Sequence, residues 1–211
     1  MNYYRLRDIR TPPFAYVVNR DEAIAHCPLC MMPFQDLRCP LQVEIFTTDL
    51  ANWRQNILGR PLMAEHWLIG DAQFRDQFAT LVGEFESEPV NVVSWLSRSP
   101  LAFPKELRNL HQAGEIPTFY RMWPKHALEL DNQLLSDFPP VTCQECKRSM
   151  ADVPFDFQLV PESEPVHQFA YLKDIHFEGY DYLFSEEIVA PLQERFPGLL
   201  LEQLSSQPNL F

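Results

Sequence analysis

The sequence predicts an α+β fold in which mixed sheet lobes carry short helices. Runs of residues typical of strands alternate with short helical patterns along the 211 residues. The chain has 19 prolines against 6 glycines, which favours rigid turns and short elements over long helices. Hydrophobic residues make up 46% of the chain, which is enough for a substantial core and excludes a disordered protein.

The first third of the chain is expected to hold three strands and one short helix. Three runs are β-branched, aromatic or alternating in polarity, namely residues 14–18, 41–46 and 67–69. Thr48 or Asp49 is placed to cap a short helix through Trp53 that stops at Gly59.

The clearest helix follows the third of these strands. Its apolar residues recur at i, i+4, i+7, i+8 and i+11, and they are Phe74, Phe78, Leu81, Val82 and Phe85. Asp71 precedes them as a candidate N-cap. We interpret this aromatic stripe as the face of the helix that packs on the core.

The middle of the chain is predicted to contain a strand at 90–96 and a short helix over 104–114. Residues 119–124 then form a dense aromatic cluster. Since Tyr, Trp and Arg dominate binding hot spots, this cluster is either part of the core or an exposed patch for a partner, and the core is the preferred interpretation.

The C-terminal part is well delimited. Strands are expected at residues 155–160, 169–172, 180–184 and 199–201. Ser185 is a good N-cap for a helix that runs to Phe196, and Pro191 is expected to kink or restart that helix. Gly198 ends it.

One internal similarity suggests how the chain is organised. Residues 68–78 and 183–192 share the same order of a strand end, a capping residue and an amphipathic helix. We therefore predict a single domain over residues 1–211 with two related lobes, residues 1–140 and 141–211.

Two Cys-x-x-Cys pairs provide the candidate site. They are Cys27 with Cys30 and Cys143 with Cys146, and 112 residues (31–142) separate them. Two thiolates three positions apart can point at one centre across a tight turn, and a second pair completes the tetrahedral sulfur shell that zinc prefers. The sequence thus predicts one structural Zn²⁺ per chain, which bridges the two lobes.

Other interpretations of these cysteines stay open. One or both pairs can be a redox dithiol, a disulfide or an unliganded pair. Cys39 is left over and is expected to be an ordinary buried or half-buried thiol. His26 adjoins Cys27 and can replace a cysteine as ligand, while Lys147 and Arg148 place a small basic spot beside the second pair.

Charge and hydropathy limit the function further. The net charge is −12 and the pI near 4.9, which disfavours binding to nucleic acid and favours a basic partner. No apolar run approaches 18 residues, so no membrane partner is expected. The N-terminus lacks the apolar stretch of a signal peptide, which predicts a cytoplasmic protein with reduced thiols.

No catalytic constellation is evident. The phosphate-binding glycine motifs, H-E-x-x-H and G-x-S-x-G are all missing. The six histidines are scattered, although His167 and His176 can converge. Since a four-cysteine zinc shell has no open coordination position, we predict that the protein is not an enzyme.

Three features of the chain can be compared with known families, namely the wide separation of the two pairs, the length and the unit around Leu183, Ser185 and Phe196. Together they resemble a bacterial family named for its double Cys-x-x-Cys-Gly motif, described from myxobacteria. Some members look like immunity proteins of interbacterial toxin systems. The family has Gly after each pair, where this chain has Met31 and Lys147. Gly there would allow the left-handed turn typical of a zinc knuckle.

The resemblance implies a protein that neutralises a cognate toxin by direct binding, and the acidic surface suits a basic toxin. Two alternatives come from other classes. One is a thiol-redox or zinc-dependent enzyme that uses the Cys-x-x-Cys pairs. The other is a zinc-ribbon adaptor of nucleic-acid machinery.

Overall fold

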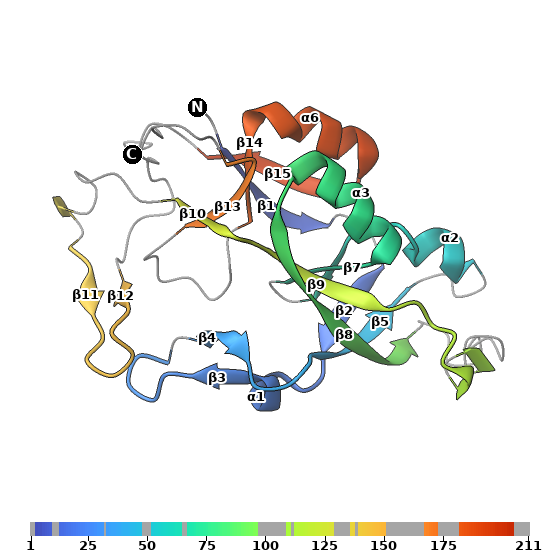
Figure 1. Ribbon diagram of the computed structural model, residues 1–211, viewed down its shortest axis with the longest axis horizontal. Coiled ribbons are helices and arrows are strands. Elements are labelled where there is room, and N and C mark those ends of the chain that lie inside the picture. The colour runs from blue at the N-terminus through green and yellow to red at the C-terminus, as the bar shows by residue number, and fades with distance from the viewer. Residues whose placement is uncertain are drawn as a thin grey trace.

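The computed structural model describes residues 3–9, 13–31, 33–47, 52–64, 67–96, 109–110, 112–128, 136–137, 139–150, 167–172 and 182–204. Within these ranges the chain forms a closed barrel, a five-stranded sheet, two hairpins and four short helices (Figure 1). The predicted α+β class is confirmed. No helix in the described part is long and apolar enough to cross a membrane.

Six strands close the barrel. In order around it they are β2 (Phe14–Val17), β5 (Gln42–Phe46), β8 (Phe85–Leu96), β9 (Phe119–Pro124), β7 (Trp67–Asp71) and β6 (Leu62–Ala64). The closing pair is parallel and joins Ala15 of β2 to Ala64 of β6. The barrel interior is filled by buried apolar side chains that include Ile45, Trp95 and Phe119. The core interpretation of the 119–124 cluster is thus confirmed for Phe119.

The five-stranded sheet joins segments from near the two ends of the chain. Its order is β10 (His126–Leu128), β13 (Phe169–Leu172), β14 (Leu183–Ser185), β1 (Tyr3–Ile9) and β15 (Leu199–Gln203). Strand β1 lies between β14 and β15 and is antiparallel to both. The sequence predicts neither β1 nor β6, because β6 has only three residues and β1 has no clear alternation of its own.

The remaining elements of the described chain are two hairpins and two short helices. They are β3 (Ile24–His26) with β4 (Pro33–Leu37), β11 (Val141–Thr142) with β12 (Ser149–Met150), α1 (Arg20–Ala23) and α2 (Trp53–Ile57). Helix α2 follows Asn52, whose side chain makes no cap hydrogen bond. The predicted caps Thr48 and Asp49 lie outside the described residues, as do the strand expected at 155–160 and most of the helix expected at 104–114.

Helices α3 (Ala72–Val82) and α6 (Glu186–Arg195) lie side by side over an aromatic core (Figure 1). The ring of Phe74 contacts that of Phe196 with centroids 4.7 Å apart, and Phe78 contacts Phe169 at 5.3 Å. A buried aromatic side chain contributes about 2–3 kcal/mol through the hydrophobic effect. This cluster therefore holds the two helices, the sheet and the barrel wall together.

The helix ends match the predictions only in part. Asp71 caps α3, because its carboxylate accepts a hydrogen bond from Phe74 N at 2.9 Å. Ser185 occupies the N-cap position of α6 as predicted, but its buried hydroxyl makes no cap hydrogen bond. The expected restart at Pro191 is also wrong, since α6 continues through it. Burial of Ile188 and Leu192 on the core offsets the lost backbone hydrogen bond.

The order of elements recurs along the chain. Helix α6 begins 114 positions after α3 (residues 186 and 72), and β15 begins 114 positions after β8 (residues 199 and 85). The cysteines of the two hairpins are 116 positions apart. A cysteine hairpin and, further along the chain, a strand, a helix and a strand thus appear twice at nearly the same spacing, with β5, α2 and β6 between them in the first case and β13 in the second. The division into lobes 1–140 and 141–211 stays a prediction.

We expect Gly70→Ala to destabilise the fold strongly. A Cβ at this position would lie 2.2 Å from Cδ1 of Phe74, whose ring is held by Phe78 and Phe196 and cannot move aside. Overpacking of this kind costs about 2 kcal/mol or more, measurable as the free energy of unfolding in urea. Gly198→Ala is the control, because its Cβ would meet only Ile9 at 3.7 Å. Equal stability of the two variants would contradict this account of Gly70.

Candidate metal centre

The first cysteine pair lies at the tip of the β3–β4 hairpin. Cys27 follows the last residue of β3, and the chain turns through Cys30 before β4 begins at Pro33. The N–H of Met31 donates to the carbonyl of Cys27 at 2.9 Å and closes the turn. Met31 has a φ of 60°, which is the left-handed region.

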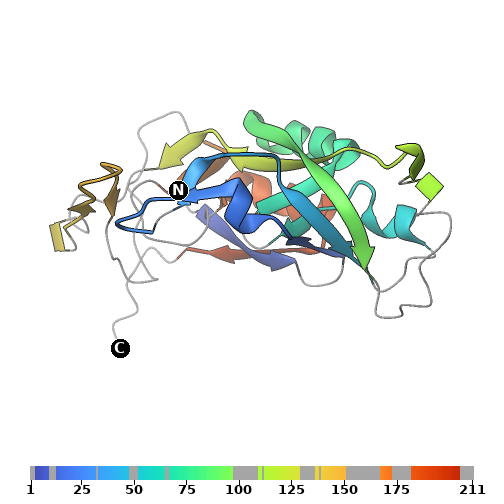
Figure 2. The same cartoon turned by 90° about the horizontal axis from the view of Figure 1, so that it is seen from below.

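The second pair repeats this geometry at the tip of β11–β12. The N–H of Lys147 donates to the carbonyl of Cys143 at 3.0 Å, and Lys147 also has a φ of 60°. The N–H of Cys143 donates to the carbonyl of Arg148 at 2.9 Å. Figure 2 shows both hairpins at the same end of the molecule.

The structure brings the four predicted cysteines together. Cys27 Sγ lies 3.7 Å from Cys143 Sγ, Cys30 Sγ lies 3.7 Å from Cys146 Sγ, and all four sulfurs are within 4.8 Å of one another. A Zn–S bond of about 2.3 Å gives a sulfur–sulfur edge of about 3.8 Å in a tetrahedron, whereas a disulfide is about 2.05 Å long. The four thiols are free, and their spacing matches a shell around one metal ion.

The cluster is half enclosed by protein. Cys27 and Cys143 are buried, whereas Cys30 and Cys146 are half-buried. One cysteine from each hairpin thus lies on the protein side and one on the solvent side. A metal ion held by all four would have no free position for a substrate, because each tetrahedral position is taken by sulfur.

Local hydrogen bonds favour the thiolate form of Cys27 and Cys146. The backbone N–H of Cys30 lowers the pKa of Cys27, and the N–H of Leu29 adds to this effect. The backbone N–H and then the side chain of Arg148 lower the pKa of Cys146 to about 6. Cys146 is therefore mostly a thiolate at neutral pH, the form that binds metal. The guanidinium group of Arg148 therefore partly neutralises the charge of the cluster.

The remaining sequence candidates lie elsewhere. Cys39 is half-buried and contacts Asn19, with 3.6 Å between Nδ2 and Sγ, so it remains an ordinary thiol outside the cluster. His26 is half-buried on β3 and does not belong to the cluster. His167 stacks on His126 with ring centroids 3.9 Å apart, and His176 lies outside the described residues.

Two strained residues complete the knuckles. In the described ranges, Met31 and Lys147 are the two non-glycine residues with positive φ. A left-handed conformation costs a residue with a Cβ about 1–2 kcal/mol. The turn that Gly would allow after each pair therefore forms here without Gly, and the two hairpins share it.

A comparison with models of known protein families, with curated proteins and with solved structures gave no match to this chain. The resemblance to the double-motif family therefore stays a prediction. The chemistry open to the site follows from the geometry of its four cysteines.

We expect Met31→Gly and Lys147→Gly each to stabilise the metal-loaded protein. Gly removes the steric cost of the left-handed turn, and the greater conformational freedom of the unfolded chain offsets part of this benefit. The expected net increase in the free energy of unfolding is about 0.5–1 kcal/mol. The measurement is the free energy of unfolding in urea. Met31→Ala and Lys147→Ala are the controls, since they keep the Cβ and should bring no gain. A gain with Ala as large as with Gly would show that the backbone conformation is not the cause.

Replacing any one of the four clustered cysteines by Ser should abolish stoichiometric metal binding. Elemental analysis of protein purified without added metal should give one transition-metal ion per chain for the native sequence and much less for Cys27→Ser or Cys146→Ser. Cys39→Ser should retain the native content, because Cys39 lies outside the cluster. An unchanged metal content in the clustered variants would exclude these residues as ligands.

Proposed function

We propose that the four cysteines hold one structural Zn²⁺ and that the protein acts by binding another protein, without catalysis of its own. The observation that carries this proposal is the four-sulfur cluster at the meeting point of the two hairpins. Tetrahedral sites with four thiolate ligands are typical of zinc or of iron–sulfur chemistry, and closed sites of four cysteines are typical of structural zinc.

The position of the cluster supports a structural role. Within the described residues, strands β11 and β12 pair with each other and join no larger sheet. In Figure 1 this hairpin lies apart from the barrel and meets the β3–β4 hairpin at its tip. The metal would therefore fix residues 143–146 against residues 27–30, which are 116 positions away in the chain. Binding energy of this kind contributes directly to folding.

The metal-linked hairpins also offer a surface for a partner. Three apolar side chains of these hairpins are strongly exposed, Leu29 at 63%, Met31 at 66% and Val141 at 71%. Leu29 and Met31 lie on the turn that follows β3, and Val141 begins β11. Apolar side chains exposed on a surface add hydrophobic contact area when a partner covers them. We name Leu29, Met31 and Val141 the knuckle surface and propose that it contacts the partner.

The partner that we propose is a cognate bacterial toxin, neutralised by occlusion of its working surface. This part rests on the resemblance to the double-motif family. The charge of −12 supports a basic toxin, because opposite net charges accelerate the encounter of two proteins. A fixed hairpin pair with exposed apolar tips suits such a direct contact.

The first test is co-expression with the protein encoded beside its gene, combined with binding of the two purified proteins. Growth protection and a submicromolar Kd are expected. Leu29→Asp and Val141→Asp should weaken binding about tenfold or more, because each places a charge in the contact. Val93→Asp, on β8 of the barrel, is the matched control, since Val93 is also exposed.

Different failures of this test have different meanings. Absence of both protection and binding would exclude the immunity function. Binding that is equally tight in all three variants would exclude the knuckle surface as the contact. A metal-free protein with one rapidly alkylated cysteine would instead support a thiol-redox enzyme.

A further inference from the structure

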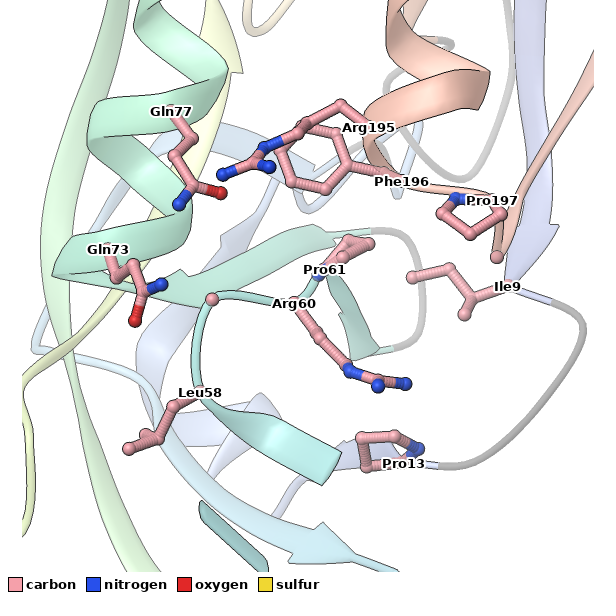
Figure 3. A pocket seen from close by; sticks show the side chains of 12 residues that line it. Ile9, Pro13, Leu58, Arg60, Pro61, Gln73, Gln77, Arg195, Phe196 and Pro197 are labelled. Carbon is pink, nitrogen blue, oxygen red and sulfur yellow. The ribbon is translucent and has the colours of Figure 1, made fainter. Parts of the chain in front are cut away.

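A separate cavity lies between the α2–β6 loop, α3 and the end of α6 (Figure 3). Its volume is about 530 Å³, which is within the range of sites for small molecules. In Figure 1 these elements lie away from the two cysteine hairpins. This cavity is therefore distinct from the metal centre and from the knuckle surface.

The walls of the cavity are apolar and firmly held. Ile9, Pro13, Pro61 and Phe196 line it and are buried. The loop that forms its floor is tied to α3, because the N–H of Gly59 donates to both carboxylate oxygens of Asp71 at 3.0 and 3.1 Å. The α2–β6 loop is thus fixed in position against α3.

The polar groups of the cavity are two guanidinium groups and two amides. Figure 3 shows Gln73 and Gln77 on α3, Arg195 extending toward Gln77, and Arg60 extending toward Pro13. Among the described residues that line the cavity, none is acidic. The cavity thus differs from the chain as a whole, which carries 29 acidic and 17 basic residues.

The two arginines also differ from others in the described chain. Arg5 pairs with Glu202 at 3.0 Å, and Arg121 pairs with Glu88 at 2.8 Å. No carboxylate within the described ranges pairs with Arg60 or Arg195. A guanidinium group carries five donors and no acceptor, so anionic oxygen is the ligand that it binds best.

We propose that this cavity binds a small organic anion, with its carboxylate, phosphate or hydroxyl oxygens bound by Arg60 and by Arg195 at different points of the cavity and a compact body against the proline and phenylalanine walls. The glutamine amides add donors and acceptors that can bind hydroxyl or carbonyl groups of the same molecule. This site is independent of the proposed toxin binding and of zinc.

The test is calorimetric titration of the full-length protein with citrate as a polycarboxylate, glucose 6-phosphate as a phosphate ester and glucose as the neutral match. At least one of the two anions is expected to bind with a Kd of about 1 mM or below. Arg60→Gln and Arg195→Gln should each weaken that binding about tenfold, because each removes a charge-assisted hydrogen bond. If citrate binds and glucose 6-phosphate does not, the cavity is a carboxylate site. If glucose 6-phosphate binds and citrate does not, it is a phosphate site.

Arg75→Gln is the control variant. Arg75 also lies on α3, but it pairs with Asp76 and does not line the cavity, so its replacement should leave binding unchanged. The proposal is overturned if neither anion binds with a Kd below about 10 mM, or if glucose binds as tightly as glucose 6-phosphate. It is also overturned if the Arg60 and Arg195 variants, folded by circular dichroism, bind like the native protein.

Discussion

The meeting of four cysteine sulfurs joins two hairpins that are 116 positions apart in the chain. Each hairpin alone is too short to be stable in water, since an isolated pair of strands with few residues buries little apolar surface. Sulfur–sulfur distances of 3.7 Å and lowered thiol pKa values make the four-cysteine cluster suitable for binding a cation. A metal ion there would offset the repulsion of the thiolates and fix the β11–β12 hairpin, which joins no larger sheet in the described part of the chain.

A second constraint is the aromatic core between α3 and α6. Phe74, Phe78 and Phe196 pack where the barrel wall meets the five-stranded sheet, and the hydroxyl of Tyr182 accepts a hydrogen bond from Leu68 N at 3.0 Å. Close packing at this junction explains why residue 70 is glycine, since any Cβ would enter the ring of Phe74. The four-cysteine cluster and this core thus lie in different parts of the molecule, and the cavity lined by Arg60 and Arg195 lies beside the core.

Local signals in the sequence are reliable where one segment determines its own structure. The helix with Phe74 and Phe78 can be predicted because its apolar residues follow the helical period and Asp71 supplies the cap. The predicted apolar face is wrong at its last residue, since α3 ends at Val82 and Phe85 begins β8. Pro191 predicts a kink or a restart of the helix, and the restart does not occur, because packing of Ile188 and Leu192 on the core outweighs the intrinsic preference of proline. Strand β1 escapes prediction, since its position depends on partners in β14 and β15, far away in the chain.

By itself, the sequence determined the α+β class, the best helix and the four residues of the metal centre, because periodicity, capping and Cys-x-x-Cys spacing are local properties. Only the tertiary structure decided the closure of the barrel through Ala15 and Ala64 and the left-handed turns at Met31 and Lys147. It alone brought Arg60 and Arg195 to one cavity. These features depend on contacts between distant segments, whose free energy comes from packing of the whole chain rather than from any local preference.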